Sequence, residues 1–262
     1  MNTKQLCIFK GLIITFCEKQ VVDLKGESIT HSGFRIKIYK LSIWNSVILA
    51  MPKIAPFQQY TSQYDEWFRK NRLAYEAELR AIKSLAPTDG YSMEVGVGTG
   101  RFAFPLGVKV GVDPSSKMIK IAQKRGINVV LGVAEKLPFV NSKFDYVFMV
   151  TTVCFLDDIS DAFKEVYRVV KKGGYLIIGL LDRNSFLGRT YLKGKNKNVF
   201  YKESTFYTVD EVIEIMKQAG FDNFEFRQTI FQNPSKITEN EPVRPGYGEG
   251  LFAVIRGRKK LV

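Results

Sequence analysis

The chain has 262 residues, a hydrophobic content of 45% and a formal net charge of +13. This length suits one α/β domain with insertions, and the hydrophobic content excludes wholesale disorder. The charge concerns solubility and partners rather than fold, so a solvated lysine-rich surface explains it, with an anionic partner such as RNA as the alternative.

The first apolar run, residues 6–17, is interrupted by Lys10. It is too short for a membrane span, which needs about 20 residues, and it lacks the small-residue cleavage site of a signal peptide. We therefore expect no membrane span. Cys7, Cys17 and Cys154 have no metal-ligand spacing and are too few and odd in number for a disulfide framework. This indicates a reducing compartment, the cytoplasm, and no metal site.

Residues 33–50 alternate apolar and basic side chains, which is consistent with one or two strands. Two interpretations of residues 1–50 stay open. Either Met51 is the true start and the earlier residues are an over-extension of the reading frame, or residues 1–50 form a small β extension. In both cases residues 51–262 form the main domain.

In the main domain, apolar residues at helical spacing predict a helix over 58–84, and a strand is expected near 91–95. Residues 94–102, Glu-Val-Gly-Val-Gly-Thr-Gly-Arg-Phe, then form a glycine loop that leads into an expected helix near 101–106. A nicotinamide-binding loop reads Gly-x-Gly-x-x-Gly, whereas the spacing here is Gly-x-Gly-x-Gly. Glycines let the backbone approach a ligand without a Cβ in the way, although an ordinary strand-to-helix turn is the alternative.

The next expected strand, near 108–112, ends in the acid Asp113. An acid about 20 residues past the first glycine is placed to accept hydrogen bonds from ribose hydroxyls. Asp113 also precedes an expected helix at 116–125, whose dipole favours an acid at this end, and both roles can coexist. A strand near 128–132 follows, and residues 129–139 read Val-Val-Leu-Gly-Val-Ala-Glu-Lys-Leu-Pro-Phe.

The glycine loop, Asp113 and the Leu-Pro-Phe segment together resemble the class I S-adenosylmethionine-dependent methyltransferases, in particular the ubiquinone/menaquinone-biosynthesis type. The resemblance implies S-adenosyl-L-methionine as cofactor, with Glu94 near its ammonium group. Val133 stands where the family often has Asp, so no side-chain contact to adenine carries over from that position. The residues that the resemblance places at the cofactor are Glu94, Gly96, Gly98, Gly100, Asp113, Pro114, Met118, Ala134, Glu135, Met149 and Val150.

Strands and helices continue to alternate along the rest of the chain. The further strands are expected near 144–150, 174–181, 223–228 and 251–256, and the further helices near 158–170 and 209–219. The last helix begins with a capping box, Thr208-Val-Asp-Glu211, and ends at Gly220. Such alternation implies a parallel sheet covered by helices, and the resemblance adds an antiparallel seventh strand beside the fifth. We therefore expect an α/β fold with a doubly wound, mostly parallel seven-stranded sheet, helices on both faces and an antiparallel last strand.

This topology also places the substrate. Ligands in open α/β sheets lie beyond the carboxyl ends of the strands. Two connections at that edge, 182–208 and 229–250, are long and contain aromatic residues, and long loops in a compact domain are usually functional. Together with the helix at 58–84 they are expected to form a lid over the substrate. The alternative is that their aromatic side chains only fill the core.

A sulfonium methyl is already a strong electrophile, so a methyltransferase mainly has to align the reacting atoms, which can be worth about 7–11 kcal/mol. A general base is optional. The only histidine, His31, lies within residues 1–50, so a tyrosine or carboxylate from the lid would have to serve, and no catalytic residue is assigned. Cys154 lacks the Pro-Cys or Thr-Cys context of a cytosine-5 nucleophile and is interpreted as a buried or pocket-lining residue.

The sequence thus predicts a methyltransferase that transfers a methyl group to a small-molecule acceptor by in-line displacement. An RNA methyltransferase and a non-catalytic S-adenosylmethionine-binding protein are the alternatives. RNA is the less favoured partner because no RNA-binding module flanks the core. A nicotinamide-dependent oxidoreductase is opposed by the glycine spacing. The sequence specifies no oligomeric state.

Overall fold

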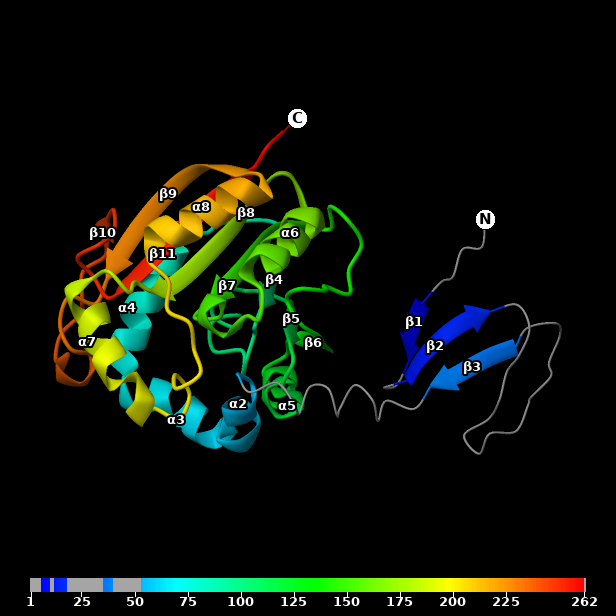
Figure 1. The fold of residues 1–262 in the computed structure, drawn as a ribbon, viewed down its shortest axis with the longest axis horizontal. Helices are drawn as coiled ribbons and strands as arrows, with labels where there is room; N and C mark the ends of the chain where they lie inside the picture. Colours follow the sequence, from blue (N-terminus) through cyan, green and yellow to red (C-terminus); the bar gives the residue numbers. More distant parts are fainter. Residues whose placement is uncertain (1–5, 10–11, 18–34, 40–52, 262) are drawn as a thin grey trace. The chain divides into compact units, whose positions relative to one another are not determined.

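The computed structural model describes residues 6–9, 12–17, 35–39 and 53–261, and the chain divides into two compact units, Met1–Met51 and Pro52–Val262. The first unit contains a three-stranded antiparallel sheet in the order β1-β2-β3 (Figure 1). Its strands are β1 (Leu6–Phe9), β2 (Leu12–Cys17) and β3 (Arg35–Tyr39). His31 lies outside the described residues.

The second unit is built on one eight-stranded sheet in the order β10-β9-β11-β8-β7-β4-β5-β6. The strands are β4 (Ser92–Val95), β5 (Val110–Asp113), β6 (Asn128–Leu131), β7 (Phe144–Val150), β8 (Val170–Leu181), β9 (Phe221–Thr229), β10 (Arg244–Pro245) and β11 (Phe252–Lys259). Strands β4 to β8 pair in parallel, and β11 runs antiparallel between β8 and β9. The expected fold class is confirmed, and the two-residue edge strand β10 adds an eighth strand.

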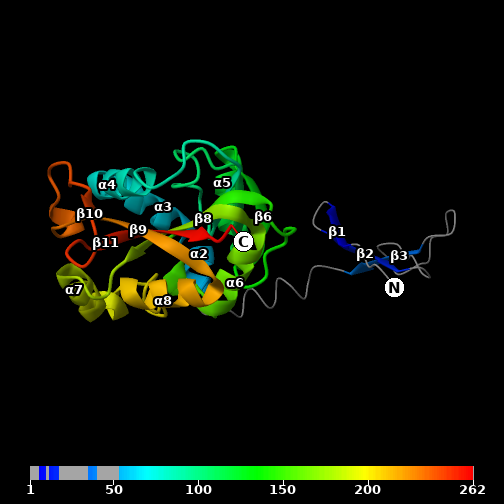
Figure 2. The ribbon, with the colours of Figure 1, turned by 90° about the horizontal axis from the view of Figure 1, so that it is seen from above.

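Helices cover both faces of this sheet, as Figure 2 shows for α4 and α5 on one side and α6 and α8 on the other. The helices are α2 (Ala55–Gln59), α3 (Thr61–Lys70), α4 (Arg72–Lys83), α5 (Ser116–Lys124), α6 (Ile159–Val169), α7 (Phe186–Gly194) and α8 (Val209–Ala219). None of the helices within the described residues is long and apolar enough to cross a membrane.

The two-residue period of a strand explains why there are two cores, one on each face of the sheet. On β7, Val147 and Met149 pack with α6 and α8, whereas Phe148 and Val150 pack with α4 and α5. All four side chains are buried. The central strands are therefore apolar on both faces, as a parallel sheet between two helical layers requires.

The helix boundaries follow local signals that are visible in the sequence. The predicted capping box of α8 is present, with Thr208 and Glu211 each bonded to the other's backbone, and Gly220 ends the helix at a φ of 107°. The expected helix over 58–84 instead divides into α2, α3 and α4. The backbone leaves helical geometry at Tyr60 and at Asn71.

Two local expectations were wrong. Residues 101–107 form consecutive turns instead of a helix. Pro105 has no backbone N–H to donate and disfavours helical geometry in the residue before it, and Gly107 turns the chain at a φ of 72°. Conversely, the long connection 182–208 contains the helix α7, whose N-cap Ser185 accepts a hydrogen bond from the N–H of Gly188.

Candidate functional site

The glycine loop follows β4 at the carboxyl edge of the parallel strands. Its glycines Gly96 and Gly98 have φ angles of 70° and 53°, which other residues rarely adopt. A Cβ at Gly96 would lie 2.4 Å from the Thr152 side chain, so this glycine is required by the close approach of the loop that follows β7. A Cβ at Gly98 would meet only Tyr64, at 3.5 Å from its hydroxyl. The loop is thus packed on one side and covered by Tyr64 on the other.

Asp113 ends β5 and ties this loop to the start of α5. Its Oδ2 accepts from the N–H of Gly98 at 2.8 Å, and its Oδ1 accepts from the N–H of Ser115 at 2.8 Å. Burial raises the pKa of the carboxyl to about 6, although both backbone N–H groups oppose that shift. Each carboxylate oxygen keeps a further lone pair. The anchoring role and a ribose-binding role are therefore compatible.

Glu94 lies on β4, two residues before Gly96, the first glycine of the loop. Its side chain is buried, and its Oε2 is fully enclosed with no hydrogen-bond partner among residues 53–261. Burial raises the pKa of this carboxyl well above its usual range; the Ala103 N–H opposes this, and the charge of Asp113 adds to it. An enclosed acceptor without a donor is costly, so this atom is suited to a cation or donor brought by a ligand.

The other residues expected at the cofactor lie on neighbouring connections and strands. Ala134 and Met118 are buried, and Pro114 is half-buried. Glu135 accepts from the N–H groups of Asp157 and Asp158 at 3.0 and 3.3 Å, so it joins the connections after β6 and β7. The side chains of Met149 and Val150 are in the two cores, which leaves only their backbone at the strand end.

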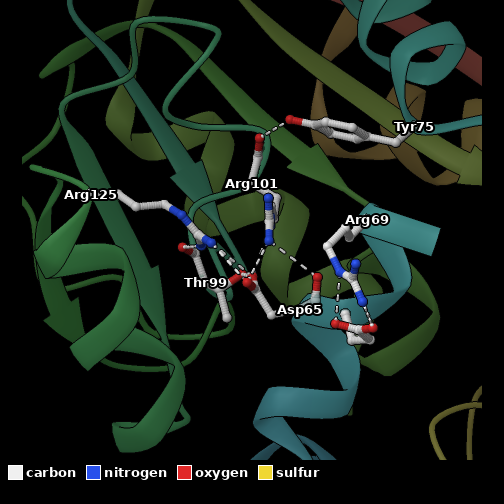
Figure 3. A network of polar contacts seen from close by, with 7 residues as sticks. Asp65, Arg69, Tyr75, Thr99, Arg101 and Arg125 are labelled. Atoms are coloured by element: carbon white, nitrogen blue, oxygen red, sulfur yellow. Dashed lines mark hydrogen bonds and ion pairs between the residues drawn. The ribbon is translucent and has the colours of Figure 1, made fainter. Parts of the chain in front are cut away.

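Helix α3 is fastened to the glycine loop by Asp65, which Figure 3 shows between two guanidinium groups. Arg101 donates to Asp65 at 2.8 and 2.5 Å, and Arg125 donates to it at 3.0 and 2.9 Å. Thr99 of the loop donates to the same carboxylate at 2.8 Å. Burial would raise the pKa of Asp65, but the hydrogen bonds from these three side chains outweigh it and hold the pKa below its usual value.

A second attachment comes from α2. The side-chain oxygen of Gln58 accepts from the Ser115 hydroxyl at 3.1 Å and from the Lys117 N–H at 3.3 Å. Lys53 also donates to the carbonyl of Leu156, in the loop after β7. The N-terminal helices of this unit are therefore bonded to three connections at the carboxyl edge of the sheet.

An aromatic wall, composed of Phe57, Tyr64, Phe155, Phe200 and Tyr201, stands beside the glycine loop. Its rings are in contact through centroid distances of 4.8 Å for Phe57–Phe155, 5.4 Å for Phe57–Phe200, 5.9 Å for Tyr64–Phe200 and 5.7 Å for Phe155–Tyr201. These residues come from α2, α3, the short 3-10 helix η1 (Val153–Phe155) and the connection after α7. Segments distant in sequence thus meet in one aromatic surface.

The remaining expected features have other roles in the structure. Burial raises the pKa of the Cys154 thiol to about 12, and the thiol donates to the carbonyl of Thr151 at 3.7 Å, so it is a poor nucleophile. Connection 229–250 is held by Glu241, which accepts from the Phe231 N–H at 2.6 Å, and by Tyr247, which donates to Asp210 of α8 at 2.8 Å. Its part in a lid stays a prediction.

Asp65, Gln58 and Arg125 could not be recognised from the sequence. Their partners lie 26 to 60 residues away, as in the bonds of Arg125 with Thr99 and Asp65, so no local spacing indicates them. Tyr64 was noted only as an apolar residue at helical spacing. The sequence contains one signal for this contact. Acidic residues stand among aromatic ones at 64–68, Tyr-Asp-Glu-Trp-Phe, and an arginine, Arg101, directly follows the glycine loop.

Comparisons with known proteins show which proteins this chain is similar to. A family model described as a methyltransferase domain matches residues 93–178. An uncharacterised protein of Methanocaldococcus jannaschii is 44% identical over 203 residues, which cover 78% of this chain and 98% of that protein. A demethylmenaquinone methyltransferase of Chlorobaculum parvum is 34% identical over 167 residues, which cover 53% of this chain and 69% of that enzyme.

One of the similar solved structures matches most of this chain. It comes from Thermotoga maritima and is described as an S-adenosylmethionine-dependent methyltransferase, possible histamine N-methyltransferase. Its sequence is 52% identical, the match covers 79% of this chain and 100% of that chain, and the TM-score is 0.77.

The attachment of α3 can be tested with Asp65→Asn. We expect the free energy of unfolding at pH 7 to fall by about 1.5–3 kcal/mol, because a hydrogen-bonded charge between two arginines is lost. The folded pKa of Asp65 is lowered, so its stabilisation is complete above the unfolded pKa of about 4 and is lost as the pH falls through the folded pKa. Urea unfolding of both proteins should therefore converge at low pH.

The matched control is Glu66→Gln, the neighbouring acid, which pairs with Arg69 on the exposed side of the same helix. It should leave stability at pH 7 unchanged, because exposed pairs contribute little. Equal stability of Asp65→Asn and the unaltered protein at pH 7 would contradict the proposed attachment.

Proposed function

The chain belongs to the class I S-adenosylmethionine-dependent methyltransferases, with S-adenosyl-L-methionine as cofactor, and we propose that its acceptor is a small molecule. The observation that carries this proposal is the aromatic wall beside Gly98, to which α2 contributes Phe57 and α3 contributes Tyr64. Small-molecule sites are concave and lined mainly by apolar and aromatic side chains with a few polar groups. The Chlorobaculum and Thermotoga relatives, whose descriptions name small acceptors, give further support.

The residues at the glycine loop fit the cofactor chemically. When bound, S-adenosyl-L-methionine supplies a methyl group on a positively charged sulfur. We assign the free lone pairs of Asp113 to the ribose hydroxyls, and the unpartnered Oε2 of Glu94 to the ammonium group. Gly98 has no side chain on the side that Tyr64 covers, so the amino-acid part can approach the loop backbone there without meeting a Cβ.

The protein's part in catalysis is alignment and the exclusion of water. Holding the reacting atoms in line can lower the barrier by about 7–11 kcal/mol. The hydrogen bonds of Asp65 and Gln58 hold α3 and α2, respectively, over the loop. Both residues therefore contribute to that alignment without touching the acceptor. We propose that segments 58–84, 182–208 and 229–250 form the lid, and the first two carry Tyr64, Phe200 and Tyr201 of the aromatic wall.

The role of Asp113 is tested by the pH dependence of S-adenosylhomocysteine binding. Its pKa is about 6, so its carboxyl gains a proton as the pH falls through that value and can no longer accept both ribose hydroxyls. We expect affinity to be constant above pH 7 and to fall below pH 6. At pH 8, Asp113→Asn should weaken binding by about 1.5–3 kcal/mol for each hydrogen bond to the charged carboxylate that is lost. In this variant the change of affinity with pH near 6 should disappear. Isothermal titration calorimetry measures both.

Asp161→Asn, an exposed acid on α6, is the matched control and should bind as the unaltered protein does. If Asp113→Asn keeps the same pH dependence, the titrating group is another acid, such as Glu94, and the assignment of Asp113 is wrong.

The acceptor class is tested by incubating the protein with methyl-labelled S-adenosyl-L-methionine and either a metabolite extract or total RNA. We expect label in small molecules and none in RNA. Label in RNA, with binding that weakens steeply as salt rises, would contradict the proposal and favour the RNA methyltransferase. Label in neither pool would favour a non-catalytic S-adenosylmethionine-binding protein.

A further inference from the structure

One backbone conformation at the carboxyl edge of the sheet is not explained by core packing. Thr151, the first residue after β7, has a φ of 50°, in the left-handed region that β-branched residues rarely adopt. Ile230, after β9, shares this conformation, but its side chain is buried in a core that holds it. Thr151 is only half-buried. Backbone strain of this kind clusters at functional sites, where the surrounding structure maintains it.

The backbone of Thr151 is bonded on both sides, whereas its side chain is free. Its N–H donates to the carbonyl of Gly179 on β8 at 2.7 Å, and its carbonyl accepts from the Cys154 thiol at 3.7 Å. The Thr151 hydroxyl has no hydrogen-bond partner among residues 53–261, and it is not enclosed as the Oε2 of Glu94 is. This hydroxyl is therefore accessible to a ligand.

Thr151 lines a narrow cavity beyond the ends of β7 and β8. Leu180 and Leu181 of β8 line it from one side, together with residues of η1. The connection after α7 contributes three aromatic side chains, Tyr201, Phe206 and Tyr207. None of the residues that line this cavity carries a charge, so the group that it accommodates is apolar or uncharged and polar.

The residues around the cavity connect it to both the glycine loop and the aromatic wall. Thr152, the neighbour of Thr151, lies against Gly96, where an added Cβ would be 2.4 Å from its side chain. On the other side, Tyr201 stacks on Phe155 of the aromatic wall, with 5.7 Å between the ring centroids. A group in the cavity thus lies between the loop assigned to the cofactor and the wall assigned to the acceptor.

We propose that the reacting group of the acceptor enters this cavity and that the Thr151 hydroxyl binds and orients it. This proposal rests on the small-molecule function and names the kind of group at the reacting end. The group is uncharged, because an unpaired charge is costly in such a cavity, and it shares a hydrogen bond with the hydroxyl. The left-handed backbone at Thr151 sets the direction of this hydroxyl, so the strain is retained for its position.

The first test compares Thr151→Val, which keeps the branched shape but lacks the hydroxyl, with the unaltered protein in the labelling reaction with metabolite extract. The extract is diluted until the rate is proportional to its concentration, so that the rate reports kcat/KM. We expect the rate to fall about two- to tenfold, the equivalent of one lost hydrogen bond, while the affinity for S-adenosylhomocysteine stays unchanged. An unchanged rate would overturn the proposal.

The second test, Thr151→Gly, removes the hydroxyl and the strain together. This variant should label the extract more slowly and yet unfold at a higher temperature, because glycine adopts a positive φ without strain. The matched control is Ser142→Gly at the opposite end of β7, in an exposed turn with a φ of 51°. It should also unfold at a higher temperature, but label the extract at the unaltered rate. A lower unfolding temperature for Thr151→Gly would assign Thr151 to packing and overturn its positioning role.

The chemistry of the labelled products separates the two levels of the account. Mild alkali releases methanol from methyl esters, so alkali-labile label would identify a carboxylate acceptor. That result would overturn the uncharged reacting group while the small-molecule function stands. Label in RNA alone, or in neither pool, would overturn that function and this proposal with it.

Discussion

The site depends on the carboxylate of Asp65. It receives hydrogen bonds from Arg101 and Thr99 of the glycine-loop region and from Arg125 at the end of α5. One helix, one loop and the end of a second helix are thereby held at a single point. Tyr64 directly precedes Asp65 on α3, so its position over Gly98 follows from the same attachment. Without it, the aromatic wall would lose its connection to the loop that it covers.

Two buried acids, Glu94 and Asp113, lie at the ends of two strands beside the glycine loop, and burial raises the pKa of each. Asp113 offsets part of the cost through two backbone N–H groups, whereas the Oε2 of Glu94 has no hydrogen-bond partner in the described part of the chain. Natural proteins retain such groups where a ligand needs them, at the expense of stability. The two apolar cores on either face of the sheet supply the stability that tolerates them.

The glycine loop, Asp113 and the order of strands could be predicted because each depends on local sequence. The loop is a turn, Asp113 ends a strand, and the side chains of a strand alternate with a period of two residues. The capping box at Thr208 was predictable for the same reason. The expected helix near 101–106 was wrong because Pro105 and Gly107 favour turns over a helix at this point of the chain. The role of Asp65 could not be predicted, since it depends on which distant segments pack against α3. A sequence pattern identifies the buried face of a helix but not its partners.

The most direct measurement is a crystal structure of the full chain with S-adenosylhomocysteine bound. It should place the ribose hydroxyls on Asp113, the ammonium group near Glu94 and the amino-acid part between Gly98 and Tyr64, with the bonds of Asp65 to Arg101 and Arg125 intact. A ligand that leaves both Glu94 and Asp113 without contact, or that binds only after α3 has left the glycine loop, would contradict this account.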